Sequence, residues 1–234
     1  MDIINKSYHA DNREIFPEIP DESIDLILTD PPYKDYQSQR PVLYPKQKPI
    51  SESEFDLEFF LRESFRVLKD SGHFYCFTDH SKFPAIKNAL DASGFRYKNC
   101  LVWVKNNHGS GDLKGDWAPQ HEFIIFAVKG KGRHINRPRP SNVLKFPKVK
   151  NEKYSHGTVK PVSLLSKIVE ASSEPGELVL DPYAGVMSTA IACIRSGRNY
   201  LMIEKDEDFF RRGFERIEAE LSEKKSQAFS QSKT

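Results

Sequence analysis

The chain has 234 residues, of which 38% are hydrophobic and 29% charged, and its formal net charge is +2. These values are typical of a globular protein with one α/β core, and they leave little chain for a second domain. No apolar run reaches the ~18 to 20 residues of a membrane span, and the N-terminus lacks the pattern of a secretion signal. We therefore expect a cytoplasmic protein, in which the widely spaced Cys76, Cys100 and Cys193 are reduced structural thiols rather than metal ligands.

The N-terminal segment predicts a short strand over residues 3–8. Asp11 follows this strand, and aspartate is a common cap at the start of a helix. Residues 21–23 then turn the chain into the next strand, on which the rest of the fold depends.

This next strand ends in a distinctive turn. The apolar run from Ile24 to Leu28 predicts a strand buried in a parallel sheet. The run ends at Asp30, and Pro31 and Pro32 stiffen the turn and stop the hydrogen-bond ladder. Since ligands bind beyond the carboxyl ends of parallel strands, the Asp30 carboxylate, the Pro31 carbonyl and the Tyr33 ring could hold a planar ring that bears an amino group. An ordinary strand-ending turn is the alternative.

The middle of the chain combines a long loop with regular elements. Residues 34–53 have no periodicity but carry Arg40, Lys46 and Lys48, which indicates a flap beside the site or a disordered segment. The pattern beyond the loop predicts helices over 55–69 and 81–91, and strands over 73–78, 95–105 and 121–128. We expect His80 to cap the second of these helices. His121 and Glu122 lack the second histidine of a His-Glu-x-x-His zinc motif, so we expect no metal site.

A basic segment follows these elements. Residues 129–153 contain nine Lys or Arg and one Glu, a local charge of +8 in a chain whose net charge is +2. Arg133, Arg137 and Arg139 could contact phosphates or guanine edges, and the sequence does not separate the two. The alternative is a solvated loop.

The C-terminal third repeats the strand-and-turn pattern. A helix is predicted from Pro161 to Ser172, and a strand then ends in a second Asp-Pro-aromatic turn, residues 181–183. A helix over 187–196 and a strand over 199–203 follow, and Glu204 closes that strand where nucleotide-binding sheets place an acid on ribose hydroxyls. Residues 205–221 predict an amphipathic helix, and the polar residues 222–234 predict a flexible tail.

The two Asp-Pro-aromatic turns together resemble those of the DNA methyltransferases that methylate amino groups with S-adenosylmethionine. In that family Asp-Pro-Pro-Tyr holds the target base, and Asp-Pro-Phe-x-Gly-Ser-Gly-Thr holds the cofactor. The base turn comes first here, as in the circularly permuted beta class, and the resemblance covers residues 3–221. It implies an α/β fold: one doubly wound, Rossmann-like methyltransferase domain over residues 1–221, circularly permuted, with helices on both faces of the sheet. Residues 129–155 would be a small target-recognition insertion.

The resemblance also implies roles for individual residues. Residues 156–161 resemble the family's His-Pro-Thr-Gln-Lys-Pro, and the N-terminus of the helix that Pro161 starts would meet the cofactor's methionyl carboxylate. The implied catalytic residues are Asp30, Pro31, Pro32 and Tyr33. The implied cofactor-binding residues are Asp11, His156, Thr158, Lys160, Asp181, Pro182, Tyr183, Gly185, Thr189 and Glu204. The implied DNA contacts are Arg40, Lys46, Lys48, Arg133, Arg137 and Arg139.

The expected function is methyl transfer from S-adenosylmethionine to the N6 amine of a flipped adenine in DNA, because Asp before Pro-Pro-Tyr usually accompanies adenine in this family. N4-cytosine methylation is the first alternative, while methylation of RNA or of a protein glutamine usually goes with the reverse motif order. Met187 stands where the family has its second cofactor-turn glycine, so it is expected either to displace the cofactor slightly or to require a shifted loop. A DNA-binding pseudo-enzyme is therefore the other alternative. The sequence leaves open a homodimer and a cognate restriction endonuclease.

Overall fold

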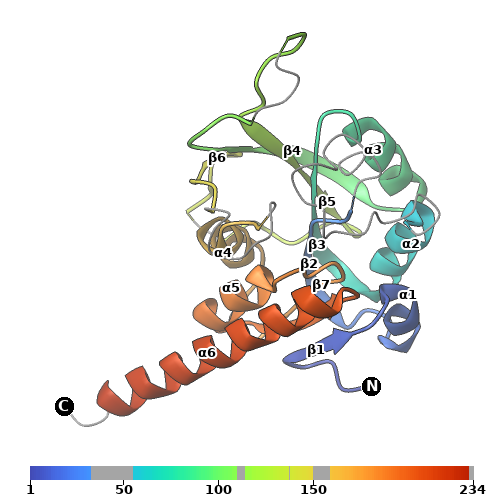
Figure 1. Cartoon of the computed structure of the whole chain (residues 1–234). Coiled ribbons are helices and arrows are strands. Elements are labelled where there is room, and N and C mark those ends of the chain that lie inside the picture. Colours follow the sequence, from blue (N-terminus) through green and yellow to red (C-terminus); the bar gives the residue numbers. More distant parts are fainter. Residues whose placement is uncertain (33–54, 110–113, 137, 150–158, 232–234) are drawn as a thin grey trace.

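The computed structural model describes residues 1–32, 55–109, 114–136, 138–149 and 159–231 (Figure 1). One sheet of eight strands runs through these residues, in the order β1-β8-β7-β2-β3-β5-β4-β6. The strands are β1 (Lys6–His9), β2 (Ile24–Thr29), β3 (Leu68–Thr78), β4 (Arg96–Val104), β5 (His121–Val128), β6 (Val143–Lys145), β7 (Leu178–Asp181) and β8 (Asn199–Glu204). The helices are α1 (Asn12–Ile15), the 3₁₀ turn η1 (Phe16–Glu18), α2 (Leu57–Val67), α3 (Phe83–Ala92), α4 (Val162–Ser172), α5 (Ser188–Ser196) and α6 (Glu207–Gln231).

The sheet is parallel from β1 through β3 and mixed beyond it. Strand β5 pairs antiparallel with both β3 and β4, and β6 pairs parallel with β4. The carboxyl ends of β2, β3, β4 and β7 therefore share one edge of the sheet with the amino end of β5. This edge carries the turns that the sequence singled out.

Helices cover both faces of the sheet, as predicted (Figure 1). On one face α4, α5 and α6 bury apolar side chains against Leu28, Phe77 and Met202. On the other face α2, α3 and η1 pack against Ile27, Phe74 and other buried side chains of the sheet. From Leu26 to Leu28, successive residues of β2 enter opposite cores, so both faces of the strand are buried.

The sheet order brings the two motif turns together. Strands β2 and β7 pair directly, with Leu26 beside Val179 and Ile27 beside Leu180. Just beyond this pairing, the Thr29 hydroxyl donates a 2.9 Å hydrogen bond to Asp181, 152 positions later in the chain. The base turn and the cofactor turn of the sequence analysis are therefore neighbours in space.

Several details differ from the sequence predictions. Strand β3 begins at Leu68 instead of at residue 73, so the helix predicted over 55–69 ends at Val67. Asp79, rather than His80, holds the start of α3, because its carboxylate accepts from the backbone N–H of Ser81 and Lys82. Strand β6 was not predicted at all. Helix α6 continues to Gln231 instead of ending at Leu221, and Lys224 in this extension donates to the Ile194 carbonyl at 2.8 Å. Among the described residues, none of the helices is both long and apolar enough to cross a membrane.

Candidate active site

The turn after β2 presents Asp30 at the shared edge of the sheet. Pro31 is buried and Pro32 half-buried, so the turn is fixed on one side by packing and throughout by its two proline rings. The Asp30 side chain keeps 28% of its surface exposed, and the Lys160 ammonium binds its Oδ2 atom. Within the described part of the chain, Oδ1 of Asp30 has no hydrogen-bond partner.

Lys160 belongs to a row of four alternating charges. Its ammonium lies between Asp30 and Glu122, with 3.2 Å to Glu122 Oε2, and only 10% of its side chain is exposed. The other oxygen of Glu122 binds Lys105 at 2.7 Å. The two ammonium groups also lie over aromatic rings, Lys160 over Phe77 at 4.9 Å and Lys105 over Trp103 at 5.2 Å from the centroids.

This row sets the protonation of its members. Burial raises the pKa of Asp30, Lys160 opposes this shift, and Glu122 adds to it. Burial also disfavours the Glu122 carboxylate, but Lys160 and Lys105 outweigh burial and lower its pKa. Burial disfavours the Lys160 ammonium, but the two carboxylates outweigh it and raise the pKa of Lys160. Lys160 is therefore a fixed positive charge at neutral pH.

This arrangement was not predicted from the sequence. The family resemblance placed Lys160 at the cofactor and implied no role for Glu122 or Lys105. Glu122 is the second residue of β5 and Lys105 follows the end of β4, so the antiparallel pairing of these strands places both at the active edge. An acid at the amino end of a strand reaches that edge only when the strand runs antiparallel, and the sequence does not give strand direction.

Asp181 and Thr189, both predicted to bind the cofactor, hold the second turn together from inside. Asp181 is 5% exposed and accepts hydrogen bonds from Thr29, from the Thr189 hydroxyl at 2.7 Å and from the Tyr183 N–H at 3.2 Å. Burial raises the pKa of Asp181 to about 6 against the effect of these donors. These contacts make Asp181 the brace between the two motif turns.

Gly185 and Glu204 form the open side of the same turn. Gly185 has a φ of +52°, which favours glycine, and a Cβ built there would meet no atom within 4 Å. Its N–H donates to Glu204 Oε2 at 2.7 Å, and Glu204 Oε1 accepts from the Asp206 N–H at 2.7 Å. Burial raises the pKa of Glu204. The turn therefore offers space and a carboxylate at the end of β8, as a nucleoside would require.

The Met187 side chain lies in the core and does not enter this space, so it gives no support to a displaced cofactor. Its side chain is fully buried among the residues of α4, α5 and α6. A Cβ built on Gly213 of α6 would lie 2.6 Å from Met187 Cγ, which shows that the methionine fills the space left by that glycine. The backbone of Met187 has a φ of +58°, the left-handed conformation that a glycine would adopt more easily.

The other predicted cofactor residues near this turn have packing roles. Tyr183 contacts Phe55 and Phe60 edge-to-face at 5.9 and 5.4 Å, and the buried Pro182 accepts a hydrogen bond from Asn12 through its carbonyl. Asp11 caps α1, as its residue type suggested, by accepting from the Arg13 N–H at 3.0 Å. Hydrogen bonds from the Arg13 side chain lower the pKa of Asp11, and Lys205 adds to this effect.

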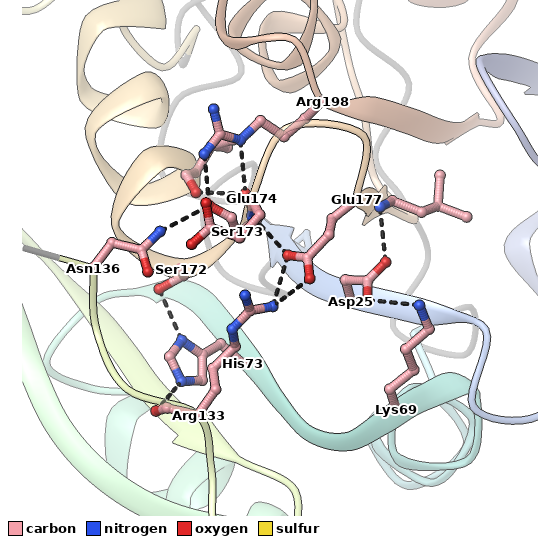
Figure 2. A network of polar contacts seen from close by, with 12 residues as sticks. Asp25, Lys69, His73, Arg133, Asn136, Ser172, Ser173, Glu174, Glu177 and Arg198 are labelled. Carbon is pink, nitrogen blue, oxygen red and sulfur yellow. Dashed lines mark hydrogen bonds and ion pairs between the residues drawn. The ribbon is translucent and has the colours of Figure 1, made fainter.

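Arg133, a predicted DNA contact, lies at the opposite edge of the sheet (Figure 2). Its guanidinium binds both oxygens of Glu177 at 2.8 and 2.6 Å, just before β7 begins. Its backbone carbonyl lies 3.0 Å from Nε2 of the buried His73, whose Nδ1 lies 2.9 Å from the Ser172 hydroxyl. Burial lowers the pKa of His73 to about 4, so this network is a neutral-histidine brace between β3 and the end of α4.

Exposed basic residues flank β6. Arg139 lies before the amino end of this strand, and Lys145 lies at its carboxyl end, level with the end of β4 at the active edge. Trp117, which the sequence analysis did not single out, is 92% exposed in the loop between β4 and β5 that projects from this edge (Figure 1). Seven predicted site residues lie outside the described residues: Tyr33, Arg40, Lys46, Lys48, Arg137, His156 and Thr158. Over the described ranges, no cluster of three or more His, Cys, Asp or Glu could hold a metal ion.

Comparisons with known proteins agree with this geometry. A family model described as DNA methylase matches residues 24–215. DNA adenine methyltransferase YhdJ of Escherichia coli (strain K12) is 30% identical, over 90% of this chain and 81% of YhdJ. The crystal structure of the M1.HpyAVI-SAM complex has a TM-score of 0.71 at 26% identity and covers 90% of this chain and 98% of that one. PvuII DNA methyltransferase, which is cytosine-N4-specific, has a TM-score of 0.72 at 18% identity over 89% and 84% of the two chains, a likeness of fold.

Proposed function

Because the chain belongs to the DNA methylase family, we propose that it methylates the N6 amine of adenine in DNA with S-adenosylmethionine as the methyl donor. The observation that carries this proposal is the Asp30 carboxylate, held at a rigid Pro-Pro turn directly beside the Asp181 turn. One turn supplies an acceptor for an amine, and the other supplies space for a nucleoside. Methyl transfer needs both within reach of each other.

The residues of the base turn would act on the target amine. An exocyclic amine is a poor nucleophile because its lone pair is delocalised into the ring. Oδ1 of Asp30 and the Pro31 carbonyl could accept its two hydrogens, which favours a pyramidal nitrogen with an available lone pair. Positioning and preorganised acceptors then supply most of the rate enhancement.

The second turn fits the proposed methyl donor. S-adenosylmethionine would supply an electrophilic methyl group on its sulfonium, which needs no metal for activation. The open space at Gly185 and the carboxylate of Glu204 suit its nucleoside part. Asp181 and Thr189 would hold the turn in shape rather than bind the nucleoside, since each is buried and bonded to the other.

DNA would approach the edge that carries Asp30, Lys145 and Trp117. The target base must leave the duplex to reach Asp30, and unstacking costs a few kcal/mol. Stacking on Tyr33, which lies outside the described residues, would repay part of this cost. Arg40, Lys46, Lys48, Arg137 and Arg139 remain predicted phosphate or base contacts, and a homodimer and a cognate endonuclease remain predicted partners.

Adenine is the favoured base for two reasons. Asp30 precedes Pro-Pro-Tyr, as in adenine-specific members of the family, and YhdJ is an adenine methyltransferase by name. The cytosine-N4-specific PvuII enzyme shares the fold but only 18% of the sequence. N4-cytosine methylation is the competing outcome.

Nucleoside mass spectrometry can decide between the two bases. The chain would be expressed in a host that lacks its own adenine and cytosine amino-methyltransferases, and the DNA digested to nucleosides. We expect N6-methyladenine above the empty-vector control. N4-methylcytosine in its place would refute the base assignment, and no modified nucleoside of either kind would refute the function.

A further inference from the structure

The contact between Lys160 and Asp30 leaves the catalytic carboxylate half occupied. Lys160 binds Oδ2, while Oδ1 has no partner among the described residues. An amine could therefore bind Oδ1 while the ammonium stays on Oδ2.

The position of Lys160 is fixed from several sides. Glu122 holds its ammonium at 3.2 Å, and the Phe77 ring lies beneath it. Lys160 also precedes Pro161, the N-cap of α4, so its backbone is held at the start of a packed helix. Displacement of this ammonium would leave two buried carboxylates without their shared partner, which is costly.

We propose that Lys160 is a positioning residue for Asp30: it aims the carboxylate and keeps it ionised, with Glu122 as the second anchor of its ammonium. This inference deepens the proposed function and rests on it. It replaces the role that sequence resemblance implied for Lys160, which was to bind the cofactor.

The charges around Asp30 show why such a residue is needed. Asp30 accepts a hydrogen bond from the amine more strongly when its carboxyl group is ionised. Burial and the nearby carboxylates Glu122 and Asp181 favour its protonated form, while Lys160 and, from farther away, Lys105 favour the ionised form. Lys160 is the only cation within 4 Å of Asp30 among the described residues.

Opposite shifts in the pH profile test this role. Single-turnover methylation would be followed against pH for wild type, Lys160→Met, Lys160→Arg and Glu122→Gln. The acid limb of the profile is the fall in rate at low pH, where Asp30 becomes protonated. Loss of the Lys160 charge should shift this limb to higher pH by about one unit or more, because a close opposite charge lowers a carboxyl pKa by roughly 1 to 3 units. Lys160→Arg should restore the limb, and Glu122→Gln should move it down because a like charge is lost. Lys167→Met, an exposed change on α4, is the matched control and should leave the limb in place.

Calorimetric titration of S-adenosylmethionine separates the two roles of Lys160. We expect the dissociation constant in Lys160→Met to stay within about threefold of wild type. An unmoved acid limb together with a dissociation constant raised about tenfold would overturn the proposal and make Lys160 a cofactor ligand.

A measurement without activity keeps this test independent of the proposed function. The carboxyl ¹³C signal of Asp30, assigned by its loss in Asp30→Asn, can be titrated in wild type and in Glu122→Gln, and in Lys160→Met where that variant folds. A higher Asp30 pKa in Lys160→Met, or a lower one in Glu122→Gln, supports the proposal even if no DNA is methylated. Equal pKa values in the folded variants would overturn it.

Discussion

Met187 belongs to the cofactor turn by its position in the sequence, but its side chain is part of the hydrophobic core. A residue other than glycine in the left-handed conformation costs about 1 to 2 kcal/mol. Burial of its side chain against Gly213 contributes about 2 to 3 kcal/mol in return. The methionine is therefore compatible with an intact cofactor turn, and it no longer argues for a pseudo-enzyme.

Met187→Gly should lower stability without improving cofactor binding. The lost core contacts exceed the relief of backbone strain, so we expect the free energy of unfolding to fall by about 1 to 3 kcal/mol. The dissociation constant for S-adenosylmethionine should stay within about threefold of wild type. Urea unfolding and calorimetric titration measure the two quantities, and clearly tighter binding in the variant would mean that Met187 does reach the cofactor.

The raised pKa of Asp181 should make the stability of the fold depend on pH. Its pKa of about 6 in the folded chain lies above the ordinary value of 3.8, so the folded state binds the proton more tightly than the unfolded state. The contribution of Asp181 to stability is therefore greatest below about pH 4 and is lost as the pH rises through about 6, an effect of roughly 2 to 3 kcal/mol. Asp181→Asn should abolish this fall.

Urea unfolding of wild type and Asp181→Asn at about pH 4.5 and 7.5 isolates the contribution, because other carboxyl groups cancel in the difference. We expect the free energy of unfolding of the variant, relative to that of wild type, to be greater at about pH 7.5 than at about pH 4.5. Parallel stability curves for the two proteins would show that the pKa of Asp181 is not raised in the folded chain.

At the scale of elements, strand direction divides the basic segment. Strand β5 carries the chain away from the active edge, so Arg133 emerges at the far edge and pairs with Glu177. Strand β6 brings the chain back, and Lys145 is exposed at the active edge. A count of charges along residues 129–153 treated these positions as equivalent, and the fold separates them.

Arg133→Gln and Lys145→Gln should therefore have opposite signatures. Each phosphate contact contributes about 0.9 to the log–log slope of DNA affinity against salt, so Lys145→Gln should flatten the slope by about that amount. Arg133→Gln should leave the slope unchanged and lower the melting temperature, since Glu177 loses its partner. DNA titrations at several salt concentrations decide this, and a flatter slope in Arg133→Gln would return that residue to the DNA interface.

Local signals in the sequence predicted β2, β7 and both of their turns, because an apolar run that ends in Asp-Pro specifies burial and termination together. Strand β6 could not be predicted, since Val143–Lys145 lies among prolines and forms only because β4 offers a free edge. The ion pair of Lys160 with Asp30 spans 130 positions, so no local pattern contains it. The direction of the Met187 side chain depends on Gly213, which comes from a different helix.

At the scale of the whole molecule, sheet order makes one site from distant parts of the chain. Strand β2 lies near the N-terminus and β7 near the C-terminus, yet they pair at the centre of the sheet. Helices α4 and α5 then cover the same face, and the start of α4 delivers Lys160 to Asp30. The two turns and the charged row would therefore form only when the whole sheet is assembled.

Single-turnover methylation by Asp30→Ala most directly tests whether Asp30 holds the target amine. The variant should fold, because Lys160 keeps Glu122 as a partner, and it should bind S-adenosylmethionine within about threefold of wild type. Its methylation rate should fall by about 100-fold or more, as expected when a preorganised polar contact to the reacting group is removed. A folded, cofactor-binding variant whose rate stays within about tenfold of wild type would contradict the assignment of Asp30 as the catalytic acceptor.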